Sequence, residues 1–258
     1  MTRHETPTRA TISAKHMVLA TDLDGTFLGG EDEDRSALYA WIETHRETVG
    51  LVFVTGRDPR FIADLTDGTG VPRPDYVVGD VGTTIAEVGP EGDIRPIPAL
   101  EAEIAQGWND AGDRVRTALE GAAGLTLQPT AFRYRVSYDL DLETFDARTV
   151  AMVEAMGFDV LISDDRFFDV LPRGISKGPS LARLIDHLGV RPETCLVAGD
   201  TMNDLSMLAL GLPAVAVGGS EPRLIEALKP HAHVHRATAR GAAGIREAIR
   251  AFDLHPHA

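Results

Sequence analysis

Met17-Val-Leu-Ala-Thr-Asp22-Leu-Asp24-Gly-Thr26 combines an apolar run with two carboxylates that follow it directly. The apolar half predicts a buried strand. Gly25 gives the backbone the freedom to leave the strand, so a phosphate, a metal ion or both would fit at this point. A simpler interpretation is a strand-ending turn, since Asp, Gly and Thr are common turn residues. Enzymes that hold a metal diphosphate also use paired Asp residues, so this stretch alone leaves the function open.

Three further apolar runs also end in polar residues. The runs at 51–54, 76–78 and 195–198 are followed by Thr55, Asp80 and Asp200. Short, fully apolar runs are typical of strands in a parallel sheet that helices cover on both faces. Ligands bind outside the carboxyl ends of such strands. We therefore predict an α/β fold, with a doubly wound, mostly parallel, Rossmann-like core that carries its polar chemistry on one edge.

The middle of the chain has a different pattern, which predicts an inserted α+β cap domain at 85–172. A hairpin is expected at 85–97, helices at 100–120 and 143–156, and strands at 132–138, 158–162 and 167–171. The core would then comprise 16–84 and 173–258, preceded by a flexible arm at 1–15. Because the core supplies the chemistry, we expect the cap to determine the substrate.

Composition limits the classes of partner. The 258 residues carry a formal charge of −14, which disfavours nucleic-acid binding. The single cysteine, Cys195, lies in an apolar run and is expected to be a buried, inert thiol. The first sixteen residues have no apolar core of a signal peptide, and no apolar run is long enough for a membrane span. We expect a cytoplasmic protein without membrane partners, as a monomer or weak dimer.

Phosphoryl transfer requires a nucleophile, a cation and hydrogen-bond donors for the phosphate oxygens, and an acid for the leaving group. The sequence offers Asp22 and Asp24 as nucleophile and acid, Thr55 as a donor, and Asp200 as a metal ligand. Lys177 is a candidate for the cation, because only three of the 25 basic residues are lysine. Where arginine is the default, a lysine marks a place where a compact charge is needed.

Four strings of the sequence carry a resemblance. They are Asp22-Leu-Asp-Gly-Thr26, Val54-Thr-Gly-Arg57, Ser176-Lys-Gly178 and Gly199-Asp-Thr-Met-Asn-Asp204. In this order they resemble the four motifs of the haloacid dehalogenase superfamily of phosphatases, with an insertion like its type IIB cap. Supporting strings, among them Arg135-Val-Ser-Tyr138 and Asp169-Val-Leu-Pro172, are most similar to the sucrose-phosphate phosphatase family. The segment 218–222 departs from that family's pattern, so the resemblance leaves the sugar open.

The resemblance implies a two-step mechanism with Mg²⁺ as cofactor. Asp22 would attack phosphorus, while Asp24 would protonate the departing sugar oxygen and later activate water. Mg²⁺ would be held by the carboxylates of Asp22 and Asp200 and by the backbone carbonyl of Asp24.

The remaining site residues follow from the same resemblance. Thr55, Gly56 and Lys177 would bind the phosphate, and Asn203 and Asp204 would orient the metal ligands. In the cap, Arg135 is a candidate for contacting the sugar, with an exposed strand face as the alternative.

Several alternatives stay open. Asn203 and Asp204 would also serve as helix caps, Thr55 as a turn cap and Lys177 as a solvated charge. His231, His233 and His235 have the spacing of a metal site, although a surface strand is the simpler interpretation, and His255 and His257 are expected to be disordered.

The expected substrate is a phosphorylated sugar, with sucrose 6-phosphate or a related disaccharide phosphate first. An amino-sugar phosphate or a glycosyl-3-phosphoglycerate is the alternative for the same chemistry. Other possible functions are a phosphosugar-binding regulatory protein and a phosphoglucomutase-type transferase.

Overall fold

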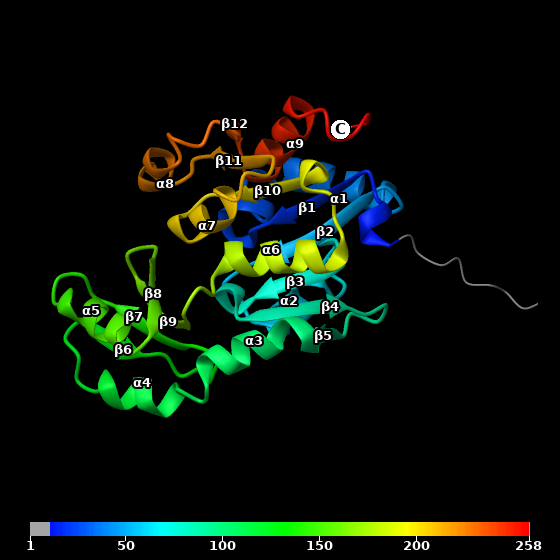
Figure 1. Ribbon diagram of the computed structural model, residues 1–258. Helices are drawn as coiled ribbons and strands as arrows, with labels where there is room; N and C mark the ends of the chain where they lie inside the picture. Colours follow the sequence, from blue (N-terminus) through cyan, green and yellow to red (C-terminus); the bar gives the residue numbers. More distant parts are fainter. Residues whose placement is uncertain (1–10, 258) are drawn as a thin grey trace, which may run out of the picture.

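The computed structural model describes residues 11–257, which form one large and one small sheet (Figure 1). The large sheet has the order β12-β11-β10-β1-β2-β3-β4-β5 and the small sheet the order β6-β7-β9-β8. The strands are β1 (Met17–Thr21), β2 (Val49–Val54), β3 (Tyr76–Gly79), β4 (Thr84–Val88), β5 (Ile94–Pro96), β6 (Leu125–Leu127), β7 (Val136–Leu140), β8 (Phe158–Ser163), β9 (Phe167–Pro172), β10 (Cys195–Gly199), β11 (Ala214–Gly218) and β12 (Val234–Arg240).

Helices cover both faces of the large sheet and one face of the small one (Figure 1). The α-helices are α1 (Asp32–Thr44), α2 (Pro59–Thr66), α3 (Pro98–Trp108), α4 (Gly112–Ala118), α5 (Arg148–Ala155), α6 (Lys177–Leu188), α7 (Leu205–Leu208), α8 (Pro222–Ala227) and α9 (Gly241–Ala251). The short helical turns are η1 (Ile12–Ala14), η2 (Leu23–Phe27), η3 (Asp80–Gly82), η4 (Pro192–Thr194) and η5 (Met202–Asp204). No helix within residues 11–257 combines the length and apolar character that a membrane span requires.

The core of the large sheet is parallel from β12 to β3, which confirms the predicted fold class. Side chains alternate between its faces: Val18 and Ala20 pack with α6 and α7, and Met17 and Leu19 pack with α1 and α9. Strand β1 lies between β10 and β2, so the polar residues after these three strands meet at one edge.

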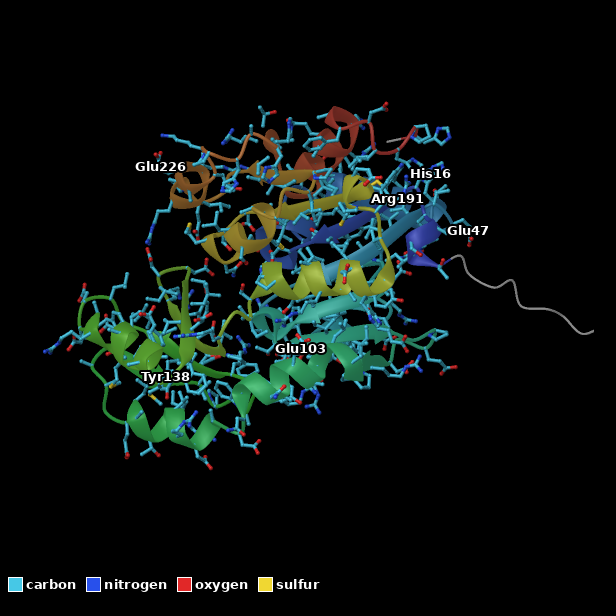
Figure 2. All side chains as sticks on the ribbon, in the orientation of Figure 1. His16, Glu47, Glu103, Tyr138, Arg191 and Glu226 are labelled. Carbon is cyan, nitrogen blue, oxygen red and sulfur yellow. The ribbon has the colours of Figure 1, made fainter. Side chains whose placement is uncertain are left out.

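The small sheet forms the cap with α4 and α5 (Figure 1). Tyr138 lies inside this layer (Figure 2), where its ring packs at 6.3 Å from that of Phe168. Helix α3 joins the two parts, because Ile104 packs into the main core and Trp108 packs into the cap. Each part therefore has an apolar core of its own.

The hairpin expected at the start of the cap belongs to the main sheet instead. Strand β4 pairs antiparallel with β3, with Ile85 opposite Val78, and β5 continues the sheet. Only the turn at 80–83 separates β3 from β4, so the chain folds back onto the strand it has just left. The cap boundary expected at residue 85 is therefore wrong, because the cap follows the hairpin.

The described part of the expected N-terminal arm packs on the core. Residues 1–10 of the arm expected at 1–15 lie outside the described part of the chain. Residues 11–15 pack on the core: Ile12 is buried, and the ammonium of Lys15 donates to the carbonyls of Arg46 and Val49 at 2.8 and 3.1 Å. An apolar side chain and a buried cation hold this part of the segment in place.

Two expected cap elements differ in extent. The helix expected at 100–120 is broken into α3 and α4 by Asn109 and Asp110, which both have positive φ. The strand expected at 132–138 begins only at Val136, because Arg133 and Arg135 make contacts to the core instead of strand pairs.

The histidines singled out in the sequence contact different partners in the structure. Within residues 11–257, the side chains of His233 and His235 have separate partners, the Leu208 carbonyl and Glu247. His255, expected to be disordered, is buried against Trp41 and His45, with ring centroids 5.1 and 4.9 Å apart. Aromatic packing orders a segment whose polar sequence predicted the opposite.

Candidate active site

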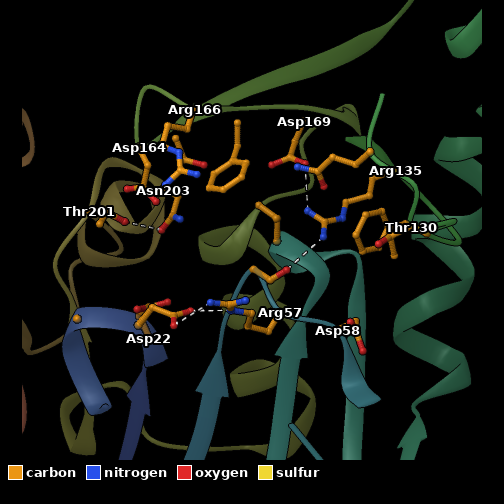
Figure 3. A pocket seen from close by; sticks show the side chains of 18 of the residues that line it. Asp22, Arg57, Asp58, Thr130, Arg135, Asp164, Arg166, Asp169, Thr201 and Asn203 are labelled. Carbon is orange, nitrogen blue, oxygen red and sulfur yellow. Dashed lines mark hydrogen bonds and ion pairs between the residues drawn. The ribbon is translucent and has the colours of Figure 1, made fainter. Parts of the chain in front are cut away.

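A pocket of about 610 Å³ lies between the carboxyl edge of the large sheet and the cap (Figure 3). The core contributes Asp22, Asp24, Gly56, Arg57, Asp200 and Asn203 to its lining. The cap contributes Gln128, Thr130, Phe132, Arg135, Arg166 and Phe167. Residues from distant parts of the sequence therefore meet at the edge where ligands were expected.

Asp22 and Lys177 form a buried ion pair at the core side of this pocket. The Lys177 ammonium donates to Oδ1 of Asp22 at 2.6 Å, to Oδ1 of Asp204 at 2.7 Å and to Oδ1 of Asn203 at 2.8 Å. Lys177 is 0% exposed, so the alternative of a solvated charge is wrong. Burial opposes its charge, but Asp204 and Asp22 outweigh that effect and raise the pKa of Lys177.

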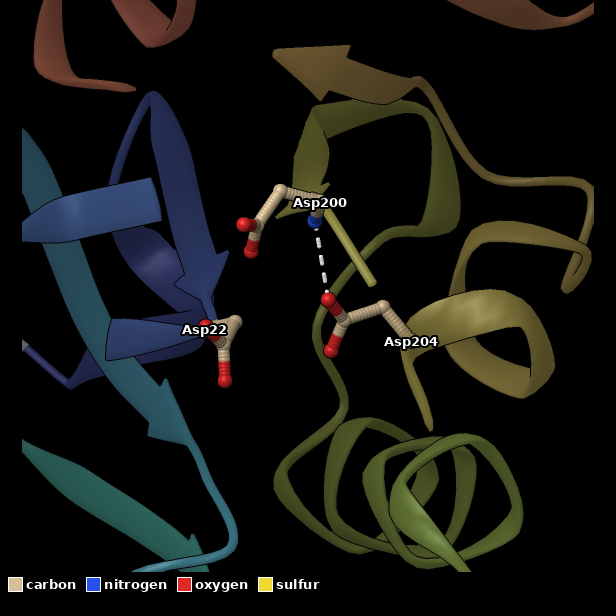
Figure 4. A group of neighbouring side chains, drawn as sticks. All are labelled: Asp22, Asp200 and Asp204. Carbon is tan, nitrogen blue, oxygen red and sulfur yellow. Dashed lines mark hydrogen bonds between the residues drawn. The ribbon is translucent and has the colours of Figure 1, made fainter. Parts of the chain in front are cut away.

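Asp22 and Asp204 bind this ammonium. Together with Asp200 they form a cluster of three carboxylates (Figure 4). Oxygen atoms of Asp22, Asp200 and Asp204 all lie within 4.8 Å of one another. Burial, followed by the negative charge of Asp204, raises the pKa of Asp200 to about 7. Burial is also the main cause that raises the pKa of Asp22 well above its usual value, against the effect of Lys177. The single ammonium of Lys177 therefore cannot balance the negative charge of all three carboxylates.

Asp204 has a structural partner for each oxygen. Oδ1 accepts from Lys177, and Oδ2 accepts from the backbone N–H groups of Asp200 and Thr201 at 2.8 and 3.0 Å. Thr201 and Asp204 also form a capping box at η5, in which Thr201 is the cap and Asp204 the third residue, whereas the Asp204 side chain makes no cap bond to the following helix α7. The same contacts fix the loop that carries Asp200.

Gly25 and Thr26 place the first motif directly against Asp200. The Thr26 hydroxyl donates to Oδ1 of Asp200 at 2.8 Å. Gly25 has a φ of +79°, and a Cβ there would overlap Oδ2 of Asp200. A side chain at position 25 would therefore push the two carboxylate-bearing loops apart.

Asp24 points away from the other carboxylates and toward Arg57. Its oxygens accept from Nε and Nη2 of Arg57 at 2.9 and 3.1 Å, and its side chain is 54% exposed. The Arg57 guanidinium lies 4.7 Å from the centre of the Phe61 ring. This bidentate contact holds Asp24 at the mouth of the pocket.

The loop 55–57 follows β2, and we call it the phosphate loop after the role proposed for it below. Thr55 is buried, and its Oγ1 accepts from the backbone N–H of Arg57 at 3.1 Å. This bond is the turn cap that was the alternative for Thr55, and it leaves the hydroxyl hydrogen to be donated elsewhere. Gly56 lines the pocket.

Arg135 lies between the cap and the phosphate loop, with a relative exposure of 6%. Its Nη1 donates to Oδ1 of Asp169 at 3.1 Å, and its Nη2 donates to the Gly56 carbonyl at 3.2 Å (Figure 3). The guanidinium lies 3.6 Å from the centre of the Phe132 ring. The exposed strand face weighed as its alternative is therefore wrong.

The donor set of the site suits Mg²⁺. Asp22 and Asp200 offer the hard oxygen ligands that this ion prefers. Burial raises the pKa of both carboxyl groups, so a bound cation would favour their ionised forms. Asp204 has all its oxygens engaged and fits the role of orienting the loop.

Arg57 and Thr26 are among the site residues to which sequence reasoning assigned no role. Arg57 holds Asp24, and its place directly after Thr55 and Gly56 was the available signal. Thr26 holds Asp200 across 174 positions of sequence, and no local pattern reveals such a contact.

Comparison with known proteins identifies the class. The family described as sucrose-6F-phosphate phosphohydrolase matches residues 15–253. The chain belongs to this family of sugar phosphatases. The predicted resemblance and the prediction of a phosphoric monoester hydrolase are confirmed at that level.

Relatives differ in substrate and in length. The chain is 40% identical over 239 residues to a glucosylglycerol-phosphate synthase of Pseudomonas anguilliseptica, covering 92% of this chain and 31% of that protein. It is 29% identical to a mannosylfructose-phosphate phosphatase of Agrobacterium fabrum, covering 93% and 98%. It is 30% identical to sucrose-phosphatase 1 of Nicotiana tabacum, covering 95% and 61%. The chain thus spans about a third of the first relative and three fifths of the tobacco protein.

Solved structures share the fold. The sucrose-phosphatase of Synechocystis sp. PCC6803, solved with sucrose and phosphate, superposes with a TM-score of 0.83 at 25% identity, covering 93% of this chain and 98% of that one. A subclass IIB sugar phosphatase of the haloacid dehalogenase superfamily has a TM-score of 0.62 at 16% identity, covering 93% and 100%. The second likeness supports the fold alone.

Proposed function

We propose that this chain is a Mg²⁺-dependent phosphatase that hydrolyses a glycosyl sugar phosphate through an aspartyl phosphate on Asp22. The observation that carries the proposal is the buried Asp22–Lys177 pair, 2.6 Å apart, beside Asp200 and beneath a pocket that the cap covers. Such an arrangement supplies a nucleophile, a fixed cation and a metal ligand at one point.

In the first step, a carboxylate oxygen of Asp22 forms a bond to phosphorus and the bond from phosphorus to the sugar oxygen breaks. Lys177 holds the other oxygen of Asp22, which orients the carboxylate for attack. Asp24, once it has left its pair with Arg57 and taken up a proton, gives this proton to the departing sugar oxygen. Its place at the mouth of the pocket is on the side from which the sugar must leave.

In the second step, a water oxygen attacks phosphorus and the bond to Asp22 breaks. Asp24 takes the proton from this water, which restores its protonated form and regenerates the Asp22 carboxylate. Inorganic phosphate is the product. The phosphate loop supplies donors through the Thr55 hydroxyl and the Gly56 backbone N–H.

Asp22 and Asp200 would hold Mg²⁺ with their carboxylates, and Asp24 with its backbone carbonyl, because its side chain is engaged by Arg57. The bound ion supplies positive charge that offsets the charge of the phosphate oxygens. Asn203 and Asp204 hold the Lys177 ammonium in place. Asp204 also fixes the loop that carries Asp200, one of the two carboxylates that would bind the ion.

For the substrate we propose a two-unit glycoside phosphate. The names of the relatives point to three candidates: sucrose 6-phosphate, mannosylfructose phosphate and glucosylglycerol phosphate. The cap side of the pocket combines Phe132 and Phe167 with Gln128, Thr130 and Arg166. Aromatic faces, hydroxyl, amide and guanidinium groups suit hydroxyl-rich rings.

The test is a kinetic screen of the purified protein with Mg²⁺ against these three compounds, glucose 6-phosphate, an amino-sugar phosphate and a glycosyl-3-phosphoglycerate. We expect the highest kcat/KM for one of the three glycoside phosphates. If kcat/KM for all three compounds were no higher than for glucose 6-phosphate, the proposal of a two-unit glycoside phosphate as substrate would be wrong. Binding without phosphate release would favour a regulatory protein, and isomerised sugar phosphate would favour a mutase.

A further inference from the structure

The three carbonyls of the phosphate loop are all held by residues outside it. The Thr55 carbonyl accepts from the N–H of Val81 at 3.1 Å, and the Arg57 carbonyl accepts from the N–H of Asp80 at 3.0 Å. The Gly56 carbonyl accepts from Nη2 of Arg135 at 3.2 Å. The hydrogen bonds to the Thr55 and Arg57 carbonyls come from the core, and the hydrogen bond to the Gly56 carbonyl comes from the cap.

The hydrogen bond from Arg135 fixes the orientation of two further groups, the Arg57 N–H and the Thr55 hydroxyl. In a trans peptide the C=O of one residue and the N–H of the next point in opposite directions. Arg135 therefore orients the Arg57 N–H through the Gly56 carbonyl. That N–H donates to Oγ1 of Thr55 at 3.1 Å, so it sets the direction in which the Thr55 hydroxyl can donate.

Protein groups hold much of the Arg135 guanidinium, although the residue also lines the pocket. Nη1 and Nη2 each donate one N–H, to Asp169 and to the Gly56 carbonyl, and the Phe132 ring lies over the guanidinium. Nε is buried without a hydrogen-bond partner among the described residues, so this atom is not presented to solvent in the pocket. Asp169 itself is buried and also accepts from the Ser137 hydroxyl, so the cap holds Arg135 firmly.

The core side of this junction is strained. Asp80 and Val81, which hold the other two carbonyls, have φ values of +51° and +60°. Within residues 11–257, Oδ1 of Asp80 is buried without a hydrogen-bond partner, and it lies 4.0 Å from Nη2 of Arg135. Strain and unsatisfied polar atoms persist where the surrounding structure imposes them, which is common beside functional loops.

We propose that Arg135 is a positioning residue that ties the cap to the phosphate loop, and not a contact for the sugar. The inference rests on the proposed function, since it requires the phosphate loop to bind the phosphoryl group. Seating of the cap then aligns the Thr55 hydroxyl for any phosphate ester, whatever its leaving group.

The test compares Arg135→Lys with the wild-type enzyme. Lysine keeps a positive charge beside Asp169, but a single ammonium loses the fork that spans Asp169 and the Gly56 carbonyl. The readouts are kcat/KM for the best glycoside phosphate, kcat/KM for 4-nitrophenyl phosphate and the calorimetric Kd for inorganic phosphate. We expect all three to worsen by a similar factor, on the order of tenfold.

A double variant, Arg135→Gln with Asp169→Asn, removes both charges and avoids an unpaired buried carboxylate. It should show the same uniform loss with a cooperative unfolding transition. Arg173→Ala is the matched control, because Arg173 is an exposed cap arginine that donates to the Glu154 carbonyl, away from the pocket. Its kinetic values should equal those of the wild type.

A loss confined to the glycoside phosphate, with 4-nitrophenyl phosphate and the Kd for phosphate unchanged, would overturn the proposal and make Arg135 a sugar contact. Unchanged values on all three readouts would overturn it as well. Wild-type hydrolysis of 4-nitrophenyl phosphate tests the phosphatase separately, so a failure there is recognised before any variant is compared.

Discussion

The ammonium of Lys177 lies between Asp22 and Asp204, 2.6 and 2.7 Å from one oxygen of each, in the first turn of α6. A cation at the N-terminus of a helix is unfavourable. Two buried carboxylates compensate for this placement, and the lysine in turn compensates for their mutual repulsion. Folding and the proposed chemistry therefore depend on the same three side chains.

Removal of this ammonium should destabilise the metal-free protein. Lys177→Ala leaves Asp22 and Asp204 buried without their cation, and we expect the free energy of unfolding to fall by about 3–5 kcal/mol. Urea denaturation measures the change. Lys229→Ala is the control, because Lys229 forms only an exposed pair with Glu226, and its midpoint should stay near that of the wild type. Equal midpoints for the two variants would contradict the assigned role.

Asp22→Asn should abolish turnover and retain the fold. The amide has the same shape as the carboxylate but is a poor nucleophile, so kcat should fall by at least about three orders of magnitude. The protein should still unfold cooperatively, because Asp204 and Asn203 continue to hold the Lys177 ammonium. Activity near the wild-type level would show that another group attacks phosphorus.

Asp24→Asn separates the acid role from a general loss of activity. A sugar oxygen needs a proton in order to leave, whereas 4-nitrophenolate leaves readily without one. We therefore expect a loss of about a hundredfold or more for a glycoside phosphate and a much smaller loss in the first step for 4-nitrophenyl phosphate. The measurement is single-turnover kinetics on both substrates, and losses of the same size would rule out the acid role.

The requirement for Mg²⁺ should depend on pH. Because the pKa of Asp200 is raised to about 7, its carboxyl is neutral below that pH and must lose a proton to bind the ion. The half-saturating Mg²⁺ concentration should therefore rise by up to about tenfold for each pH unit below 7. Titration of activity with Mg²⁺ between pH 5.5 and 8 measures this.

The Thr26→Val variant supplies the control for that titration. The Thr26 hydroxyl bond favours the charged form of Asp200 and lowers its pKa, so its removal should raise the pKa further. The pH below which more Mg²⁺ is required should then move upward. A requirement independent of pH in both proteins would show that Asp200 is not a ligand.

The convergence of Asp22, Thr55, Lys177 and Asp200 could be predicted from sequence, because each follows or faces the carboxyl end of a strand in one parallel sheet. Apolar runs and turn residues are local signals, and they locate such positions well. The rarity of lysine was also informative, since Lys15 and Lys177 are both buried and bound to oxygen.

Features that depend on tertiary contacts could not be predicted. The hairpin β4–β5 has the same local pattern whether it joins the cap or extends the core, and only its pairing with β3 decides. The break between α3 and α4 depends on two left-handed residues, Asn109 and Asp110, in a sequence that otherwise continues a helix. Arg135 has an aromatic, alternating context typical of a strand, yet one of its partners, the Gly56 carbonyl, lies in the core.

The absent side chain of Gly25 has a consequence for the tolerance of this protein to mutation. The φ of +79° and the contact with Asp200 leave no room for even a methyl group. In a saturation library selected for phosphate release, position 25 should therefore be as depleted of substitutions as position 22, although glycine carries no reactive group. Position 25 would then tolerate as few substitutions as the proposed nucleophile, although its residue takes no part in the reaction.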